Sequence, residues 1–156
     1  MRLQFHHVPL WRQLASWRSA ILLGTCGCLH AATITWNNTN TGFTNGGSWV
    51  GNNAPANSLT TDIALFGTAS PTNQPDLSTG STRSVAGLIF ASGAGAFTFS
   101  GSKTLNLGAS GIVNNSSSTQ TMTVSLSLGT ASVFTTSGTG ALNIQSTLDT
   151  GGFALS

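Results

Sequence analysis

The chain contains very little charge. Only 5% of its 156 residues are Asp, Glu, Lys or Arg, against about 25% in an average soluble domain. Glu and Tyr are absent altogether. Coiled coils, helical bundles and basic nucleic-acid-binding proteins need charged residues in quantity, so the composition excludes these classes and a nucleic-acid partner with them. Charged disorder is disfavoured for the same reason.

The segment 1–31 differs from the rest of the chain. Its charged residues are all arginines: Arg2, Arg12 and Arg18. An apolar run follows at 19–29, and after it come the small residues Ala31 and Ala32. This order is typical of a secretory signal peptide, so we expect a helical leader, 1–31, cleaved after Ala31 or Ala32, and a secreted or surface location. The apolar run is too short for a membrane span, which takes about 20 residues.

Two other interpretations of the leader stay open. The segment could contain a short buried N-terminal helix, or Gly27-Cys28 could be a lipoprotein attachment site. Both cysteines, Cys26 and Cys28, lie in this leader at a spacing too short for the usual zinc pair. After cleavage, the mature chain would fold without disulfides, and its two basic and three acidic residues would give a net charge of about −1.

The remaining sequence predicts short β-strands, because apolar or alternating runs recur between clusters of Gly, Ser, Asn and Thr. The expected strands are 33–36, 63–66, 85–90, 96–100, 104–107, 111–114, 122–128, 132–136, 141–145 and 153–155. Alternation of apolar and polar residues is clearest in 104–107 and 122–128. No helical periodicity interrupts these runs, so the predicted fold class is all-β.

Strand spacing allows either a β-sandwich or a β-solenoid with about 20 residues per coil. The steps from Leu105 to Leu126 and from Leu126 to Ile144 are both close to that length. Composition favours the solenoid. Its coils stack at about 4.8 Å, so like charges on successive coils would lie above one another and repel, and a chain with few charged residues is expected. A flexible Ser/Gly-rich linker is the remaining alternative, but the eight Phe and four Trp of the whole chain, most of which follow the leader, argue against it.

Residues 32–83 differ from the section that follows. They hold Trp36, Trp49, three of the four prolines and several Asn/Gly turns. We expect this segment to be an N-terminal cap that protects the open edge of the first coil. Residues 84–156 would then form the solenoid coils, ending as a truncated fragment.

Several segments in this order resemble the start of bacterial proteins with autotransporter-associated β-strand repeats, also called passenger-associated transport repeats. The matching segments are 34–36, 48–49, 62–66, 85–90 and 104–108. The resemblance implies a right-handed parallel β-helix that is exported to the cell surface or beyond. Its expected role is a non-enzymatic scaffold or adhesin that contacts surface glycans or proteins.

No catalytic, metal-binding or cofactor-binding pattern is present. The three acidic residues of the mature chain, Asp62, Asp76 and Asp149, are widely separated, and no histidine follows His30. The alternative function is a carbohydrate-binding or carbohydrate-active β-helix, in which Trp36 and Trp49 would stack on sugar rings; packing beneath the cap is the competing role for both. The apolar residues 153–155 predict self-association through an open C-terminal edge.

Overall fold

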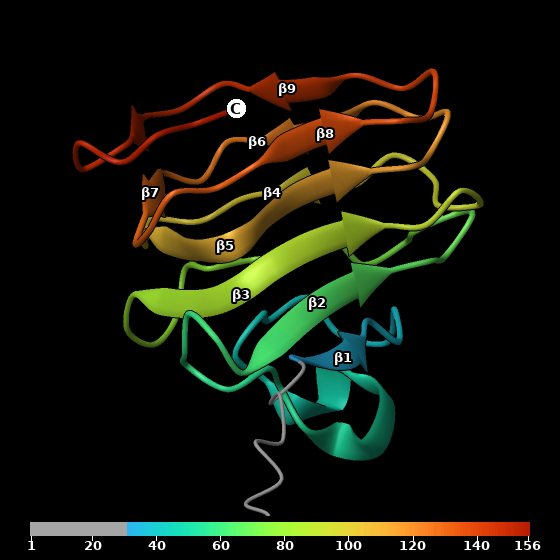
Figure 1. Cartoon of the computed structure of the whole chain (residues 1–156). Coiled ribbons are helices and arrows are strands. Elements are labelled where there is room, and N and C mark those ends of the chain that lie inside the picture. The colour runs from blue at the N-terminus through green and yellow to red at the C-terminus, as the bar shows by residue number, and fades with distance from the viewer. Residues whose placement is uncertain (1–30) are drawn as a thin grey trace, which may run out of the picture.

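The computed structural model describes residues 31–156, and the expected signal peptide lies outside the described residues except for Ala31. The described chain winds through about four turns of a parallel β-solenoid (Figure 1). Every pair of named strands is parallel. The predicted all-β solenoid is therefore confirmed at this level, and the sandwich alternative is wrong.

The strands form two sheets that run along the stack. One sheet has the order β1-β2-β3-β5-β7-β10, and β8 also pairs with β5. Its strands are β1 (Ala32–Thr35), β2 (Asp62–Phe66), β3 (Arg83–Phe90), β5 (Leu105–Asn114), β7 (Leu126–Leu128), β8 (Phe134–Thr136) and β10 (Leu148–Asp149). The smaller sheet contains β4 (Thr98–Phe99), β6 (Gln120–Met122) and β9 (Leu142–Ile144).

The register of the larger sheet gives the length of a coil. Leu105 pairs with Leu126, as their spacing in the sequence predicts. Leu126 then pairs with Leu148 and not with Ile144. Ile144 instead pairs with Met122 in the smaller sheet. The expected step from Leu126 to Ile144 was wrong because it joined residues of two different sheets.

Strand boundaries differ from the prediction where the chain turns a corner. The predicted strands 104–107 and 111–114 are joined in β5, whereas 122–128 is divided between β6 and β7. Met122, Val124 and Leu126 are all buried. Inward and outward side chains thus continue to alternate around the corner, so alternation alone does not reveal where the backbone changes sheet.

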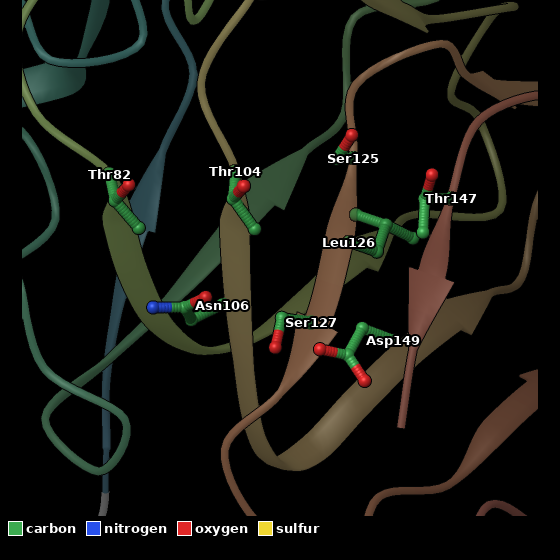
Figure 2. Close-up of a pocket in the computed structure, with 8 residues that line it drawn as sticks. All are labelled: Thr82, Thr104, Asn106, Ser125, Leu126, Ser127, Thr147 and Asp149. Carbon is green, nitrogen blue, oxygen red and sulfur yellow. The ribbon is translucent and has the colours of Figure 1, made fainter. Parts of the chain in front are cut away.

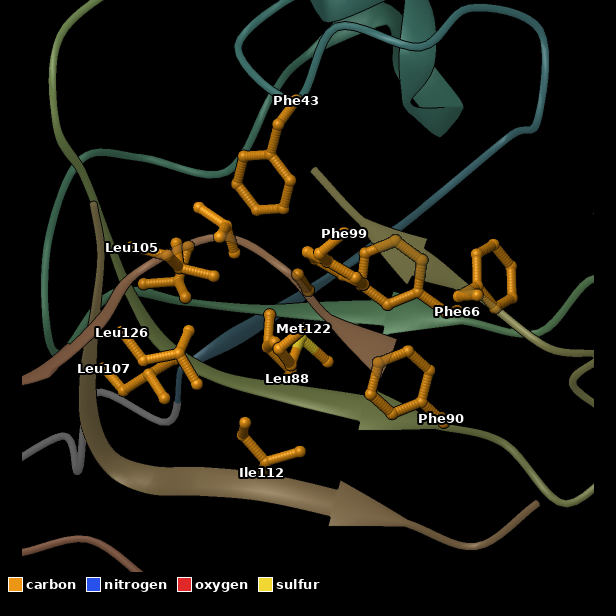
Figure 3. Close-up of a cluster of buried hydrophobic side chains, with 14 of the residues drawn as sticks. Phe43, Phe66, Leu88, Phe90, Phe99, Leu105, Leu107, Ile112, Met122 and Leu126 are labelled. Atoms are coloured by element: carbon orange, nitrogen blue, oxygen red, sulfur yellow. The ribbon is translucent and has the colours of Figure 1, made fainter. Parts of the chain in front are cut away.

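The hydrophobic core runs inside the coils. Figure 3 shows Leu105 and Leu126 at one side of the coil interior and Phe66 and Phe90 at the other. Phe66 and Phe90 occupy registered positions on adjacent coils, and their rings stack with centroids 5.3 Å apart. Parallel in-register pairing places like residues above one another, which allows one ring to cover the next.

Buried polar side chains connect successive coils at the turns. Asn114 is fully buried, and its Nδ2 donates to the carbonyls of Gly140 and Ala141, each at 3.2 Å. Gln120 accepts from the Phe97 amide at 3.0 Å and donates to the Gly95 carbonyl at 3.1 Å. These bonds satisfy backbone groups that the short strands leave unpaired.

The two ends of the stack differ. Residues 32–83, expected to form a cap, contain β1 and β2, which belong to the larger sheet. Two short 3-10 helices, η1 (Gly46–Ser48) and η2 (Val50–Asn52), lie beside β1 (Figure 1). At the other end, residues 141–156 are all exposed or half-buried. No helix within residues 31–156 has the length and apolar character of a membrane span.

Candidate ligand-binding hollow

Four successive coils each carry a tripeptide whose first and third residues are polar. The central residues of these tripeptides occupy the same register position in the larger sheet. The tripeptides are Thr82-Arg83-Ser84, Thr104-Leu105-Asn106, Ser125-Leu126-Ser127 and Thr147-Leu148-Asp149. Because side chains alternate along a strand, the polar neighbours point outward and form two parallel rows.

These rows line a hollow of about 400 Å³ on the outer face of the larger sheet. We call it the outer hollow, and its lining residues are Thr82, Thr104, Asn106, Ser125, Leu126, Ser127, Thr147 and Asp149. Figure 2 shows the four residues that precede the central positions in one row, and Asn106, Ser127 and Asp149 in a second row. The volume falls in the range of small-molecule sites, about 300–1,000 Å³.

Much of the hydrogen-bonding capacity of the hollow is free. Within residues 31–156, the hydroxyls of Thr104, Ser127 and Thr147 make no hydrogen bond. Asn106 Nδ2 has a long contact of 3.4 Å to Ser84 Oγ. Asp149 Oδ1 accepts from the Gly151 amide at 2.9 Å, which leaves its second oxygen open to solvent.

The lining is polar and carries one negative charge. Hydroxyl groups both donate and accept, the Asn106 amide does the same through two different atoms, and the Asp149 carboxylate accepts. Among residues 31–156, no lysine or arginine lines the hollow. The lining side chains project from paired strands or from residues next to them, so their positions are set by backbone hydrogen bonds along the stack.

Trp36 and Trp49, the candidates for glycan stacking, lie in the core. Their exposed fractions are 2% and 0%, and the two rings meet edge to face with centroids 5.0 Å apart. Trp49 Nε1 donates to the Phe43 carbonyl at 2.9 Å, and Trp36 Nε1 donates to the Asn73 carbonyl at 3.3 Å. In this structure neither indole presents a ring face to solvent.

The three aspartates within residues 31–156 are engaged in local hydrogen bonds. Asp62 Oδ2 accepts from the Ala56 amide at 2.6 Å, and Asp76 Oδ1 accepts from the Ser78 amide at 2.9 Å. Asp76 and Asp149 both bond the amide two residues later, the arrangement of an Asx turn. No group of three His, Cys, Asp or Glu residues within 31–156 is placed to hold a metal ion.

The expected cleavage positions lie at the start of β1. Ala32 is its first residue, and the Ala32 amide donates to the Thr61 carbonyl at 2.7 Å. A cut after Ala31 would keep this bond, whereas a cut after Ala32 would remove it. The fold therefore gives the two expected cleavage positions different consequences.

Arg83 occupies an unusual position that the sequence did not predict. It stands in register with Leu105, so a cation begins a row that continues with leucines. Its Nη2 donates to the Pro55 carbonyl, and its Nε is buried without a partner among the described residues. Burial lowers the pKa of Arg83, and the nearby Asp62 carboxylate partly offsets this effect.

The outer hollow was also not predicted from the sequence. Its signal is a polar–x–polar tripeptide that recurs at the same register position on four successive coils. Comparison of the chain with protein-family models, curated proteins and solved structures finds no match. The resemblance to autotransporter-associated repeats thus rests on the pattern of residues alone.

Proposed function

We propose that the chain is a non-catalytic segment of a secreted or surface-displayed β-solenoid that acts as a scaffold or adhesin. The observation that carries this proposal is the repetition, on four successive coils, of two outward polar residues that flank one central residue. In the proposal, residues 1–31 direct export and the coils are displayed outside the cell. The resemblance to bacterial passenger repeats supports the same role.

The proposed mechanism is attachment through many weak contacts. Each coil presents similar polar groups, spaced by about 4.8 Å along the stack. Individual hydrogen bonds at a wet surface contribute little, about 1 kcal/mol each. When many chains are displayed together, simultaneous contacts raise the apparent affinity far above that of one chain. Surface glycans and surface proteins are the proposed partners.

Export and adhesion are tested separately. An alkaline phosphatase reporter fused after residue 32 should become active outside the cytoplasm of a bacterial host, and deletion of residues 19–29 should abolish this activity.

Beads coated densely with the chain should remain attached to immobilised surface glycans or surface proteins, whereas sparsely coated beads should detach. Failure of dense beads to attach to any surface of either kind would contradict the adhesin role.

A second function, carbohydrate binding, is favoured by the outer hollow. Its lining is rich in hydroxyls that have no partner within residues 31–156. Hydrolysis of a sugar chain ordinarily uses two carboxyl groups, whereas Asp149 is the single carboxylate of the lining. The second function is therefore proposed as binding without cleavage.

A further inference from the structure

We propose that the outer hollow binds a linear, neutral oligosaccharide that lies along the stack. This inference deepens the second proposed function and rests on display of the chain where glycans occur. Asn106 and Ser127, which pair in register on adjacent coils, would form the centre of the site. Thr104 and Thr147 would contribute hydroxyls from the neighbouring row.

The chemistry of the lining matches a ligand that is itself covered with hydroxyls. A sugar hydroxyl donates one hydrogen bond and accepts others, and the Ser and Thr side chains can complement it in either sense by rotation. Asn106 offers a donor and an acceptor on one rigid amide. A ligand rich in carboxylates or sulfates is disfavoured, because Asp149 would repel it and the described part of the chain places no cationic side chain in the lining.

The geometry of the rows favours a linear ligand. Equivalent side chains repeat from coil to coil at about 4.8 Å, and the two rows are separated by two residues along each strand, or about 6.6 Å. The first spacing is comparable to the length of a pyranose ring, so successive rings of an extended chain can meet successive coils. Because the rows are fixed by strand pairing, binding requires little ordering of the protein.

The test uses the full chain and titrates it by calorimetry with hexasaccharides. The neutral probes are cellohexaose, laminarihexaose, xylohexaose and mannohexaose, and hexagalacturonic acid is the anionic probe. We expect saturable binding of at least one neutral hexasaccharide, with binding of the anionic probe at least about tenfold weaker, which corresponds to about 1.4 kcal/mol. Absence of binding by every neutral probe, or preference for the anionic one, would overturn the inference.

Two double variants locate the binding site. Asn106→Ala with Ser127→Ala removes the central polar groups of the hollow and should weaken binding by about 10- to 30-fold, as expected for two lost hydrogen bonds. The matched control is Thr121→Ala with Asn143→Ala. These residues are also paired in register on adjacent coils, but in the smaller sheet and outside the hollow. The control should bind as tightly as the unchanged chain.

Further measurements distinguish a loss of ligand binding from a loss of folding, and glycan binding in the hollow from the general adhesin role. Thr147→Ala changes an exposed side chain that has no hydrogen bond within residues 31–156, so it should retain the native circular dichroism spectrum and still weaken binding by about threefold. Unchanged affinity in the hollow variants, or equal loss in the control, would refute the site. Attachment of beads carrying the hollow variants would then show whether the adhesin role survives without it.

Discussion

Substitution of Gly111 by alanine should destabilise the fold strongly, because this glycine lies where two coils touch. Gly111 is in the middle of β5 and has a φ of 56°, in the left-handed region. A methyl group on its Cα would stand 1.9 Å from the Val133 carbonyl oxygen and 2.8 Å from the carbonyl carbon. Both are backbone atoms of the next coil, so the coils must move apart to accommodate the methyl group.

The expected loss of stability follows from two contributions. A left-handed conformation costs an L-residue about 1–2 kcal/mol. The Val133 carbonyl also accepts a hydrogen bond from the Ile112 amide at 3.1 Å, and displacement of this carbonyl breaks a bond that contributes about 0.5–1.5 kcal/mol. Together with lost packing between the coils, Gly111→Ala should reduce the free energy of unfolding by about 2–4 kcal/mol.

Gly93→Ala is the matched control for this prediction. Its φ lies outside the left-handed region, and no atom lies within 4 Å of the position that a methyl group would take. The same substitution should be neutral there or stabilise by about 0.4–1 kcal/mol, since alanine restricts the unfolded chain. Urea titrations followed by circular dichroism measure both variants. Equal unfolding midpoints for Gly111→Ala and Gly93→Ala would refute the close approach of the coils at Gly111.

Three other perturbations test the core, the turns and the exposed end of the stack. Leu105→Ala should lower the free energy of unfolding by about 2–5 kcal/mol, because Leu105 is fully buried; a loss below about 1 kcal/mol in urea titrations would contradict its place in the core. Asn114→Ala should cost about 2–3 kcal/mol through its lost inter-coil bonds, clearly more than Asn115→Ala at the half-buried neighbour. The double variant Phe153→Lys with Leu155→Lys should reduce self-association of the chain in light scattering, because both apolar side chains are exposed at 45% and 40%. An unchanged mass would reject that end as the contact.

The strands were largely predictable from local pattern, since alternating residues such as Leu105, Asn106 and Leu107 have one physical solution in a half-buried strand. The corners were not predictable. Inward residues continue through Val124 without a break, and Leu148–Asp149 is too short to leave a periodic signal. Parallel pairing between successive turns depends on the whole coil, which no local window contains.

The candidate site could not be predicted from the sequence, for a related reason. Trp49 and Trp36 are the most conspicuous side chains for binding in the sequence, yet both fill the coil interior. Asn106 and Ser127, by contrast, are ordinary polar residues in a chain that is close to half Ser, Thr, Asn and Gly. Only the strand register brings them together on one face.

The outer hollow and both proposals depend on the register in which the coils stack. Pairs of engineered cysteines test this register most directly. In the full chain with Cys26 and Cys28 replaced by serine, Thr121→Cys with Asn143→Cys places two thiols at registered positions of β6 and β9, where Cα atoms lie about 4.8 Å apart. Thr121→Cys with Gln145→Cys shifts one thiol by two positions, to about 8 Å, beyond the reach of a disulfide. We expect a rapid intramolecular disulfide in the first variant and none in the second. Equal cross-linking of both, or of the shifted pair alone, would contradict the register.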